Sequence, residues 1–128
     1  MNNTILHVAK RGEGKTKWLL NVARKYQNIE TPIYIVCDTE EEHNNFCNKY
    51  TMMYSEVCKV KPLTVSDNIE NSIVLIDDIF EHDLETSVIR NIQSECKKLF
   101  ITIEGCMEDS EDPTYSYEQL SLFDILNN

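Results

Sequence analysis

The chain contains few glycines, few basic residues and no long apolar run. Its 128 residues include only 3 glycines and 12 lysines and arginines, against 22 aspartates and glutamates. No segment approaches the roughly 18 consecutive apolar residues needed to span a bilayer, and the first residues lack the organisation of a signal peptide. We therefore expect a cytoplasmic protein with no membrane partner.

The excess of acidic residues limits the partners that the chain is expected to have. The formal net charge is -10, whereas a broad nucleic-acid surface needs a positive field. Nucleic acid is therefore expected only through a partner protein or a small local patch. The length predicts a single domain over 1–128, and the 41% of hydrophobic residues provide a modest core.

The cysteines do not form the pattern of a metal site or of a disulfide framework. They are odd in number and widely spaced, with no CxxC and no Cys/His pair at zinc-ligand spacing. We interpret them as small apolar core residues of a protein in a reducing compartment. They are Cys37, Cys47, Cys58, Cys96 and Cys106.

Two of the three glycines occur in one short stretch near the N-terminus. Residues 9–16 read Ala-Lys-Arg-Gly-Glu-Gly-Lys-Thr and fit [Ala/Gly]-x-x-x-x-Gly-Lys-[Ser/Thr], the Walker A or phosphate-binding loop. The stretch 4–9 is apolar and β-branched like a buried strand, and the apolar residues that follow Lys15 repeat at helical spacing. Strand, glycine-bearing loop and helix are the context that this motif requires.

The residue types of this loop predict a site for a nucleotide, ATP, with Mg²⁺. Gly12 and Gly14 tolerate positive φ angles, so successive N–H groups can form an anion nest at the start of a helix. Lys15 is expected to reach the β- and γ-phosphates, and the Thr16 hydroxyl to ligate Mg²⁺. The expected nucleotide-binding residues are Gly12, Glu13, Gly14, Lys15, Thr16 and Lys17.

A second stretch predicts the acidic half of the same site. Residues 72–76 form an apolar run that ends in Asp77 and Asp78, which is typical of a central parallel strand with carboxylates at its end, the Walker B pattern. Asp77 is expected to hold Mg²⁺ through water. Asp78 is the candidate for polarising an attacking water, and Lys15, at the phosphates, is also a catalytic candidate.

Further elements complete an alternating pattern of strands and helices. We predict strands at 33–37 and 99–104 and helices from 39 to about 50 and from 83 to 98, the latter closed by Lys97 and Lys98. The strand at 99–104 is expected between the two motif-bearing strands, which makes Thr102 and Glu104 candidates to contact the γ-phosphate. Thr39 and Glu40 to Glu42 are interpreted as a helix cap and solvated face rather than as a metal site.

Three parts of the chain are harder to interpret. The segment 51–71 has no sustained period and is left open between an extra strand near 57–60 and a partner surface. An acidic linker is predicted over 106–115. The helix predicted over 116–127, with Leu120, Phe123 and Leu126 or Ile125 facing inward, either packs on the sheet edge or serves as a docking element.

The order of these elements resembles the core of P-loop NTPases, in the class that includes RecA-like and AAA+ ATPases. The resemblance covers 4–104 and implies an α/β fold, a three-layer sandwich with a mostly parallel sheet of about four or five strands. The loop is most similar to those of phage terminase ATPases, which carry an arginine where this chain has Arg11. The resemblance therefore makes Arg11 a catalytic candidate at the γ-phosphate; a solvent-facing role stays equally open.

The leading hypothesis is a Mg²⁺-dependent ATP hydrolase that acts with a protein partner or as a homo-oligomer, in phage or mobile-element DNA metabolism as the resemblance implies. The alternative is a non-enzymatic, acidic binding or inhibitor protein on a P-loop fold. Asp78 favours the alternative, because the class usually has the longer glutamate there. A small kinase is disfavoured because the only arginines besides Arg11 are Arg24 and Arg90.

Overall fold

The computed structural model describes residues 3–27, 30–105, 122, 124 and 126 and shows an α/β architecture. Strands and helices alternate along most of the chain. The strands are β1 (Thr4–Ala9), β2 (Ile33–Ile35), β3 (Lys61–Pro62), β4 (Ile73–Ile76) and β5 (Lys98–Glu104). The helices are α1 (Lys15–Tyr26), α2 (Glu40–Tyr54), the 3₁₀ turn η1 (Ile79–Glu81) and α3 (Thr86–Glu95).

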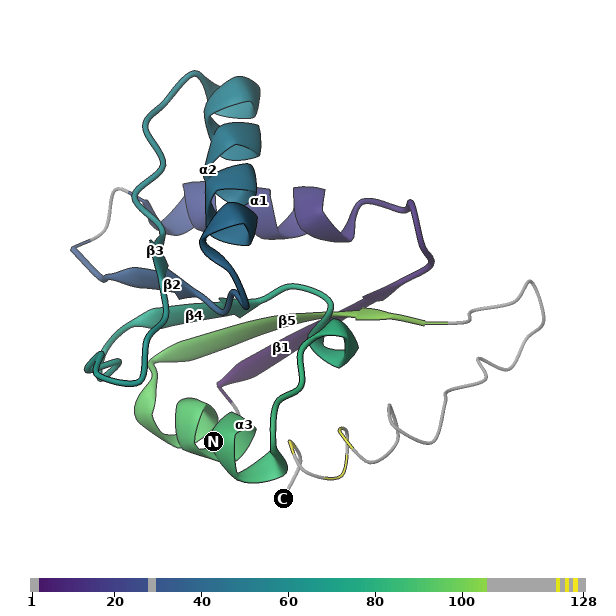
Figure 1. The fold of residues 1–128 in the computed structure, drawn as a ribbon, viewed down its shortest axis with the longest axis vertical. Helices are drawn as coiled ribbons and strands as arrows, with labels where there is room; N and C mark the ends of the chain where they lie inside the picture. Colours follow the sequence, from purple (N-terminus) through teal and green to yellow (C-terminus); the bar gives the residue numbers. More distant parts are fainter. Residues whose placement is uncertain (1–2, 28–29, 106–121, 123, 125, 127–128) are drawn as a thin grey trace.

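The strands form one parallel sheet in the order β1-β5-β4-β2-β3 (Figure 1). β5 pairs with β1 on one side and with β4 on the other, so that Leu99 lies opposite both Thr4 and Val74. The predicted position of the last strand between the two motif-bearing strands is therefore confirmed. Because every pairing is parallel, the carboxyl ends of all strands lie at the same edge.

Helices cover both faces of the sheet. Figure 1 shows α1 and α2 on one side of the sheet and α3 on the other. On the first side Leu19 and Tyr50 pack in one core cluster with Leu75, and on the second side Ile89 packs with Ile76. The α/β sandwich predicted from the sequence is confirmed, and the sheet formed by the described residues is entirely parallel rather than mostly so.

The central strand β4 explains why its sequence is an unbroken apolar run. All of its residues, Ile73–Ile76, are buried. Successive side chains of a strand point to opposite faces, so Ile73 and Leu75 join the cluster beneath α1 and α2, and Val74 and Ile76 join the cluster beneath α3. A strand covered on both faces has no polar side, and its sequence shows no alternation.

The helix predicted at 83–98 is wrong in both of its bounds. α3 spans only Thr86–Glu95, and Lys98 begins β5 opposite Ile73. Lys97 and Lys98 therefore do not close the helix. The apolar spacing predicted too long a helix because Leu84 packs against the α3 core from a segment that is not helical.

The segment 51–71 contains the end of α2 and a short edge strand. α2 continues to Tyr54 and ends at Ser55, whose φ of 54° lies in the left-handed region. The extra strand is β3, which pairs its Lys61 and Pro62 with β2 and begins just after the predicted range 57–60. Proline is tolerated there because β3 is the edge of the sheet.

The described cysteines are free thiols in or beside the core. Cys96 is buried under α3, and burial raises the pKa of its thiol to about 11. Cys37, Cys47 and Cys58 are half-buried, and Cys106 lies outside the described residues. The interpretation of the cysteines as core residues is therefore confirmed for Cys96, and Cys37 and Cys58 pack against the margin of the core.

Much of the chain beyond Gly105 lies outside the described residues, including the predicted acidic linker at 106–115. The predicted final helix, 116–127, is described at residues 122, 124 and 126. Leu122 and Leu126 are buried in the cluster that contains α3, which confirms the inward position of Leu126; Leu122 was not predicted to face inward. In the described part of the chain, none of the helices has the length and apolar composition needed to cross a membrane.

Leu75→Ala tests the packing of the sheet. Leu75 is fully buried in β4, so its truncation leaves a cavity and should lower the free energy of unfolding by about 2–5 kcal/mol in urea denaturation. Val65→Ala is the control because Val65 is fully exposed, and it should change stability by less than about 0.5 kcal/mol. Equal effects of the two substitutions would contradict this packing.

Candidate functional site

The ends of β1, β4 and β5 bring the two predicted motifs together at one edge of the sheet. The loop after β1 leads into α1, and Asp77 and Asp78 follow β4 directly. β5 lies between these strands, so its last residues reach the same edge. In open parallel sheets the crevice outside the carboxyl ends of the strands is the usual ligand site.

The loop before α1 has the backbone geometry that its glycines predict. Gly12 and Gly14 have φ angles of 81° and 85°, which residues with a Cβ rarely adopt. Gly14 is the N-cap of α1 and offers no side chain to cap it, so the first N–H groups of the helix stay available to a ligand. Glu13 closes the loop onto Lys10, whose N–H donates to the Glu13 carboxylate at 3.2 Å.

A chain of hydrogen bonds links the two motifs through β5. The Thr16 hydroxyl donates to Oδ2 of Asp77 at 2.8 Å, and the Thr102 hydroxyl donates to Oδ1 of the same carboxylate at 2.6 Å. Thr102 is fully buried, so its hydroxyl holds Asp77 in one orientation. Thr16 and Asp77, the predicted metal ligands, are therefore adjacent and offer the oxygen donors that Mg²⁺ prefers.

Lys15 lies between two carboxylates at the base of the site. Its side chain is 9% exposed, and Nζ lies 3.4 Å from Oδ2 of Asp78 and 3.9 Å from Oε2 of Glu104. A buried ammonium needs such anionic partners because burial without them is costly. The structure thus brings Lys15 and Asp78, two of the predicted catalytic residues, together with Glu104, the predicted γ-phosphate contact.

Asp78 adopts an uncommon backbone conformation. Its φ and ψ of 54° and 66° are left-handed, which aspartate tolerates better than most residues but still at a cost in strain. Its N–H donates to the Thr102 hydroxyl at 2.7 Å, and its carbonyl accepts from the N–H of Glu81 at 2.9 Å. These contacts hold the residue in place and turn its carboxylate towards Lys15.

Glu81 is a site residue that the sequence interpretation missed. In the 3₁₀ turn η1, residues three apart lie on the same side, which brings Glu81 back to Asp78. The negative charge of Asp78, together with burial and a hydrogen bond to that carboxylate, raises the pKa of Glu81 above its usual value. The spacing of Glu81 from Asp78 indicates this contact only if residues 79–82 form a turn, and the sequence pattern predicts no turn there.

His82 and Asp38 were also missed, and they connect the ends of β2 and β4. The His82 side chain is only 7% exposed; its Nε2 lies 2.9 Å from the backbone carbonyl of Asp77, and its Nδ1 lies 3.0 Å from Oδ1 of Asp38. Burial lowers the pKa of His82, but the hydrogen bond and charge of Asp38 outweigh burial, and the pKa is raised.

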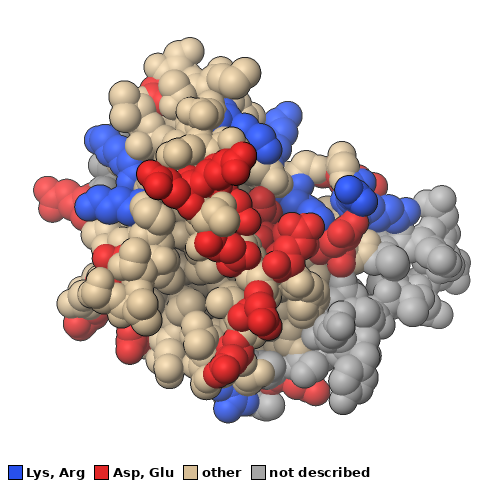
Figure 2. Space-filling model, in the orientation of Figure 1, with Lys and Arg blue, Asp and Glu red and all other residues tan. Residues whose placement is uncertain are grey.

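Several of these residues line a cavity of about 350 Å³ that extends from Lys15 to α2. Figure 2 shows acidic side chains gathered across the centre of this face, from the start of α2 towards η1. Lys15 and Lys49 are the cations at the cavity wall. The lining residues are Lys15, Thr16, Ile35, Val36, Cys37, Glu42, Asn45, Phe46, Lys49, Asp77, Asp78, Glu81 and His82.

Other predicted site residues lie away from this cavity. Arg11, Gly12, Glu13, Gly14 and Lys17 belong to the exposed part of the loop and first helical turn and do not line it. Arg11 makes no ion pair with any residue that the structure describes. The catalytic role of Arg11 therefore stays a prediction, and the solvent-facing alternative agrees with its position.

The cap of α2 follows the prediction with one difference. Thr39 is the N-cap, and its hydroxyl accepts from the N–H of Glu42 at 3.2 Å. The Glu42 carboxylate accepts a hydrogen bond from the N–H of Asp38, at 3.0 Å, rather than from the N–H of Thr39 as in a capping box. Glu42 consequently leans towards the cavity and lies beside His82, not wholly on a solvated face.

Comparisons with known proteins add no family assignment. No protein-family model matches the chain, and no curated protein is significantly similar to it. The chemistry of the site must therefore be inferred from the contacts described above.

Thr102→Val tests the link that Thr102 makes between the two aspartates. Valine has nearly the same shape but leaves the Asp78 N–H and one Asp77 oxygen without their partner, which should cost about 1–3 kcal/mol in urea denaturation. Thr102→Ser keeps the hydroxyl and should retain more of the stability. Equal losses in the two variants would show that the hydroxyl does not matter.

Proposed function

We propose that this protein is a cytoplasmic ATP-binding protein and Mg²⁺-dependent ATP hydrolase of the P-loop type. The observation that carries the proposal is the contact between the Thr16 hydroxyl and the Asp77 carboxylate, beside the nearly buried Lys15. A hydroxyl, a carboxylate and an ammonium at the start of a helix form the combination that binds a metal-bound phosphate chain. The positive φ angles of Gly12 and Gly14 support the same function.

The charge balance of the site supports a requirement for Mg²⁺. Lys15 faces the carboxylates of Asp78 and Glu104, and Asp77 and Glu81 lie close by. A phosphate chain entering this surplus of negative charge would be repelled by it unless a divalent cation came with it. Thr16 and Asp77 would hold that cation, Asp77 through water, and Mg²⁺ would supply charge neutralisation at the phosphates.

Two carboxylates are candidates for activating water. Asp78 is held by Thr102 and Lys15, which makes it a rigid acceptor. Glu81 has a longer side chain and a raised pKa, which brings its proton affinity closer to that suited to a general base at neutral pH. The presence of Glu81 compensates for the short side chain of Asp78, and it supports hydrolysis over binding alone.

The lining of the cavity supports action with a protein partner or as an oligomer. Among the described residues, no arginine lines the cavity, although ATPases commonly use an arginine to neutralise charge that develops during phosphoryl transfer. Arg11 or a residue of a second chain would have to supply it. The likeness of the loop to terminase loops is what supports a role in phage or mobile-element DNA metabolism.

The second candidate function is a non-enzymatic binding or inhibitor protein with an acidic docking face. The band of acidic side chains in Figure 2 favours it, as does the pairing of Lys15 with two carboxylates. Such a face would attract a basic partner electrostatically and would need no bound nucleotide. The two functions therefore differ in their dependence on Lys15.

Lys15→Ala tests nucleotide binding. Loss of a charge-assisted hydrogen bond worth about 1.5–3 kcal/mol should weaken Mg²⁺-dependent binding of a fluorescent ATP analogue about 10- to 100-fold. Lys59→Ala is the matched control because Lys59 is exposed and does not line the cavity, and it should bind as the wild type does. Absence of binding to the wild type at millimolar nucleotide would overturn the proposal and favour the acidic docking function.

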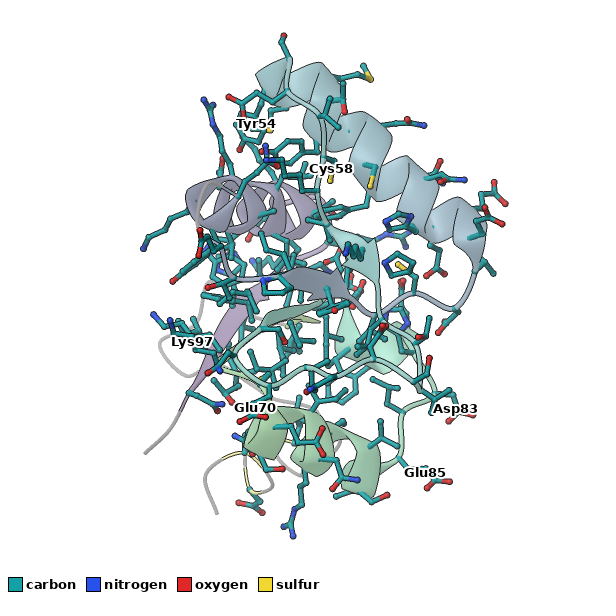
Figure 3. All side chains as sticks on the ribbon, turned by 90° about the vertical axis from the view of Figure 1, so that its left-hand side faces the viewer. Tyr54, Cys58, Glu70, Asp83, Glu85 and Lys97 are labelled. Atoms are coloured by element: carbon teal, nitrogen blue, oxygen red, sulfur yellow. The ribbon has the colours of Figure 1, made fainter. Side chains whose placement is uncertain are left out.

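Asp78→Asn tests hydrolysis separately from binding. Asparagine tolerates the left-handed backbone and keeps the shape of the side chain, but it cannot accept a proton from water. Turnover, measured as phosphate release, should fall about 100-fold or more while nucleotide affinity changes little. Asp83→Asn is the control, since Figure 3 shows Asp83 pointing outwards at the edge of the molecule. Unchanged turnover in Asp78→Asn would assign the role of base to another group.

A further inference from the structure

A second cluster of metal-ligating side chains lies beside the site just described. Asp38 follows β2, Glu42 belongs to the first turn of α2, and His82 follows η1. One ligand atom from each of them lies within 4.8 Å of the other two. These donors come from three separate elements, so the fold rather than local sequence brings them together.

The orientation of the His82 ring fits a metal ligand. Its Nε2 lies 2.9 Å from the carbonyl of Asp77 and must donate, because a carbonyl oxygen only accepts. The other nitrogen, Nδ1, faces Oδ1 of Asp38 at 3.0 Å. Metal-binding histidines usually donate one ring N–H to a carbonyl or carboxylate and coordinate through the other nitrogen. A cation beside Nδ1 would replace the proton that His82 shares with Asp38.

The carboxylates are oriented, and they are accessible from solvent. The Asp38 N–H donates to Oε2 of Glu42 at 3.0 Å, which holds that side chain over the loop after β2. Asp38 is about half exposed, whereas the imidazole of His82 is almost buried. An ion can therefore enter from solvent and meet a ligand that is already fixed.

We propose that Asp38, Glu42 and His82 form a binding site for a divalent transition-metal ion, best matched by Zn²⁺. One imidazole nitrogen and two carboxylate oxygens favour zinc over Mg²⁺, which prefers oxygen ligands alone. Three protein ligands leave a further position for water or another molecule. The site does not depend on nucleotide binding, and it is distinct from the oxygen donors of Thr16 and Asp77.

Metal binding here would stiffen the segment that carries the carboxylates of the main site. His82 holds the Asp77 carbonyl, and Asp77 and Asp78 are the residues between β4 and η1. An ion that fixes Asp38 and His82 therefore ties the end of β2 to the end of β4. Its binding should raise the thermal stability of the folded chain, since a ligand that binds only the folded state stabilises it by mass action.

The test is titration of the intact, reduced chain with Co²⁺, followed by displacement with Zn²⁺. We expect one Co²⁺ per chain, with d–d absorption and without the sulfur-to-cobalt charge-transfer band of a cysteine site. Glu42→Gln, on the exposed first turn of α2, should weaken binding by at least about 10- to 100-fold. Glu41→Gln makes the same change of charge one residue away and should bind as the wild type does.

Thermal melting supplies a second readout. Zn²⁺ should raise the melting temperature of the wild type and of Glu41→Gln, but not that of Glu42→Gln. Equal metal affinity in the two glutamine variants would overturn the proposal and leave Asp38 and His82 as an ordinary ion pair. A thiolate charge-transfer band that persists in Glu42→Gln would likewise overturn it, because the ion would then be bound by cysteines.

Discussion

The burial of β4 and β5 between two layers of helices is the constraint on which the rest of the structure depends. Both strands are buried on both faces and pair in parallel, so their carboxyl ends leave the core at the same edge. The polar residues that follow cannot remain in the core. Asp77, Asp78 and Glu104 therefore converge at that edge, and the site follows from packing as much as from its own chemistry.

Thr102 connects the buried strand β5 to the two aspartates of the site. It is the buried polar residue of a strand that is otherwise apolar from Leu99 to Ile103, and its hydroxyl satisfies Asp77 and the Asp78 N–H together. A buried hydroxyl must find partners or cost free energy. The hydrogen bond from the Thr102 hydroxyl holds the Asp77 carboxylate in one orientation. The hydrogen bond that the hydroxyl accepts from the Asp78 N–H helps to offset the strain in the Asp78 backbone.

The electrostatics of the edge point to cations. Lys15 is outnumbered by the carboxylates around it, and the cavity continues to the cluster of Asp38, Glu42 and His82. Like charges at such spacing oppose folding unless they are protonated, paired or neutralised by ions. In both proposals a divalent cation neutralises the excess of carboxylates at this edge: Mg²⁺ with a nucleotide at one end of the cavity, and a transition metal at the other.

The sequence alone determined the sheet, the order of its elements and the contact between the loop and the acidic strand end. Gly12, Gly14 and the run before Asp77 indicated these features because backbone freedom and uninterrupted burial leave local patterns in a sequence. Only the tertiary structure decided where α3 begins, how β3 pairs, and that Glu81 and His82 turn back to the site. Apolar spacing does not by itself show where a helix begins, and Leu84 packs partly buried against the core without being helical. The contact of His82 with Asp38 joins residues 44 positions apart, and such a pairing leaves no local pattern, because the packing of β2 beside β4 alone brings the two side chains together.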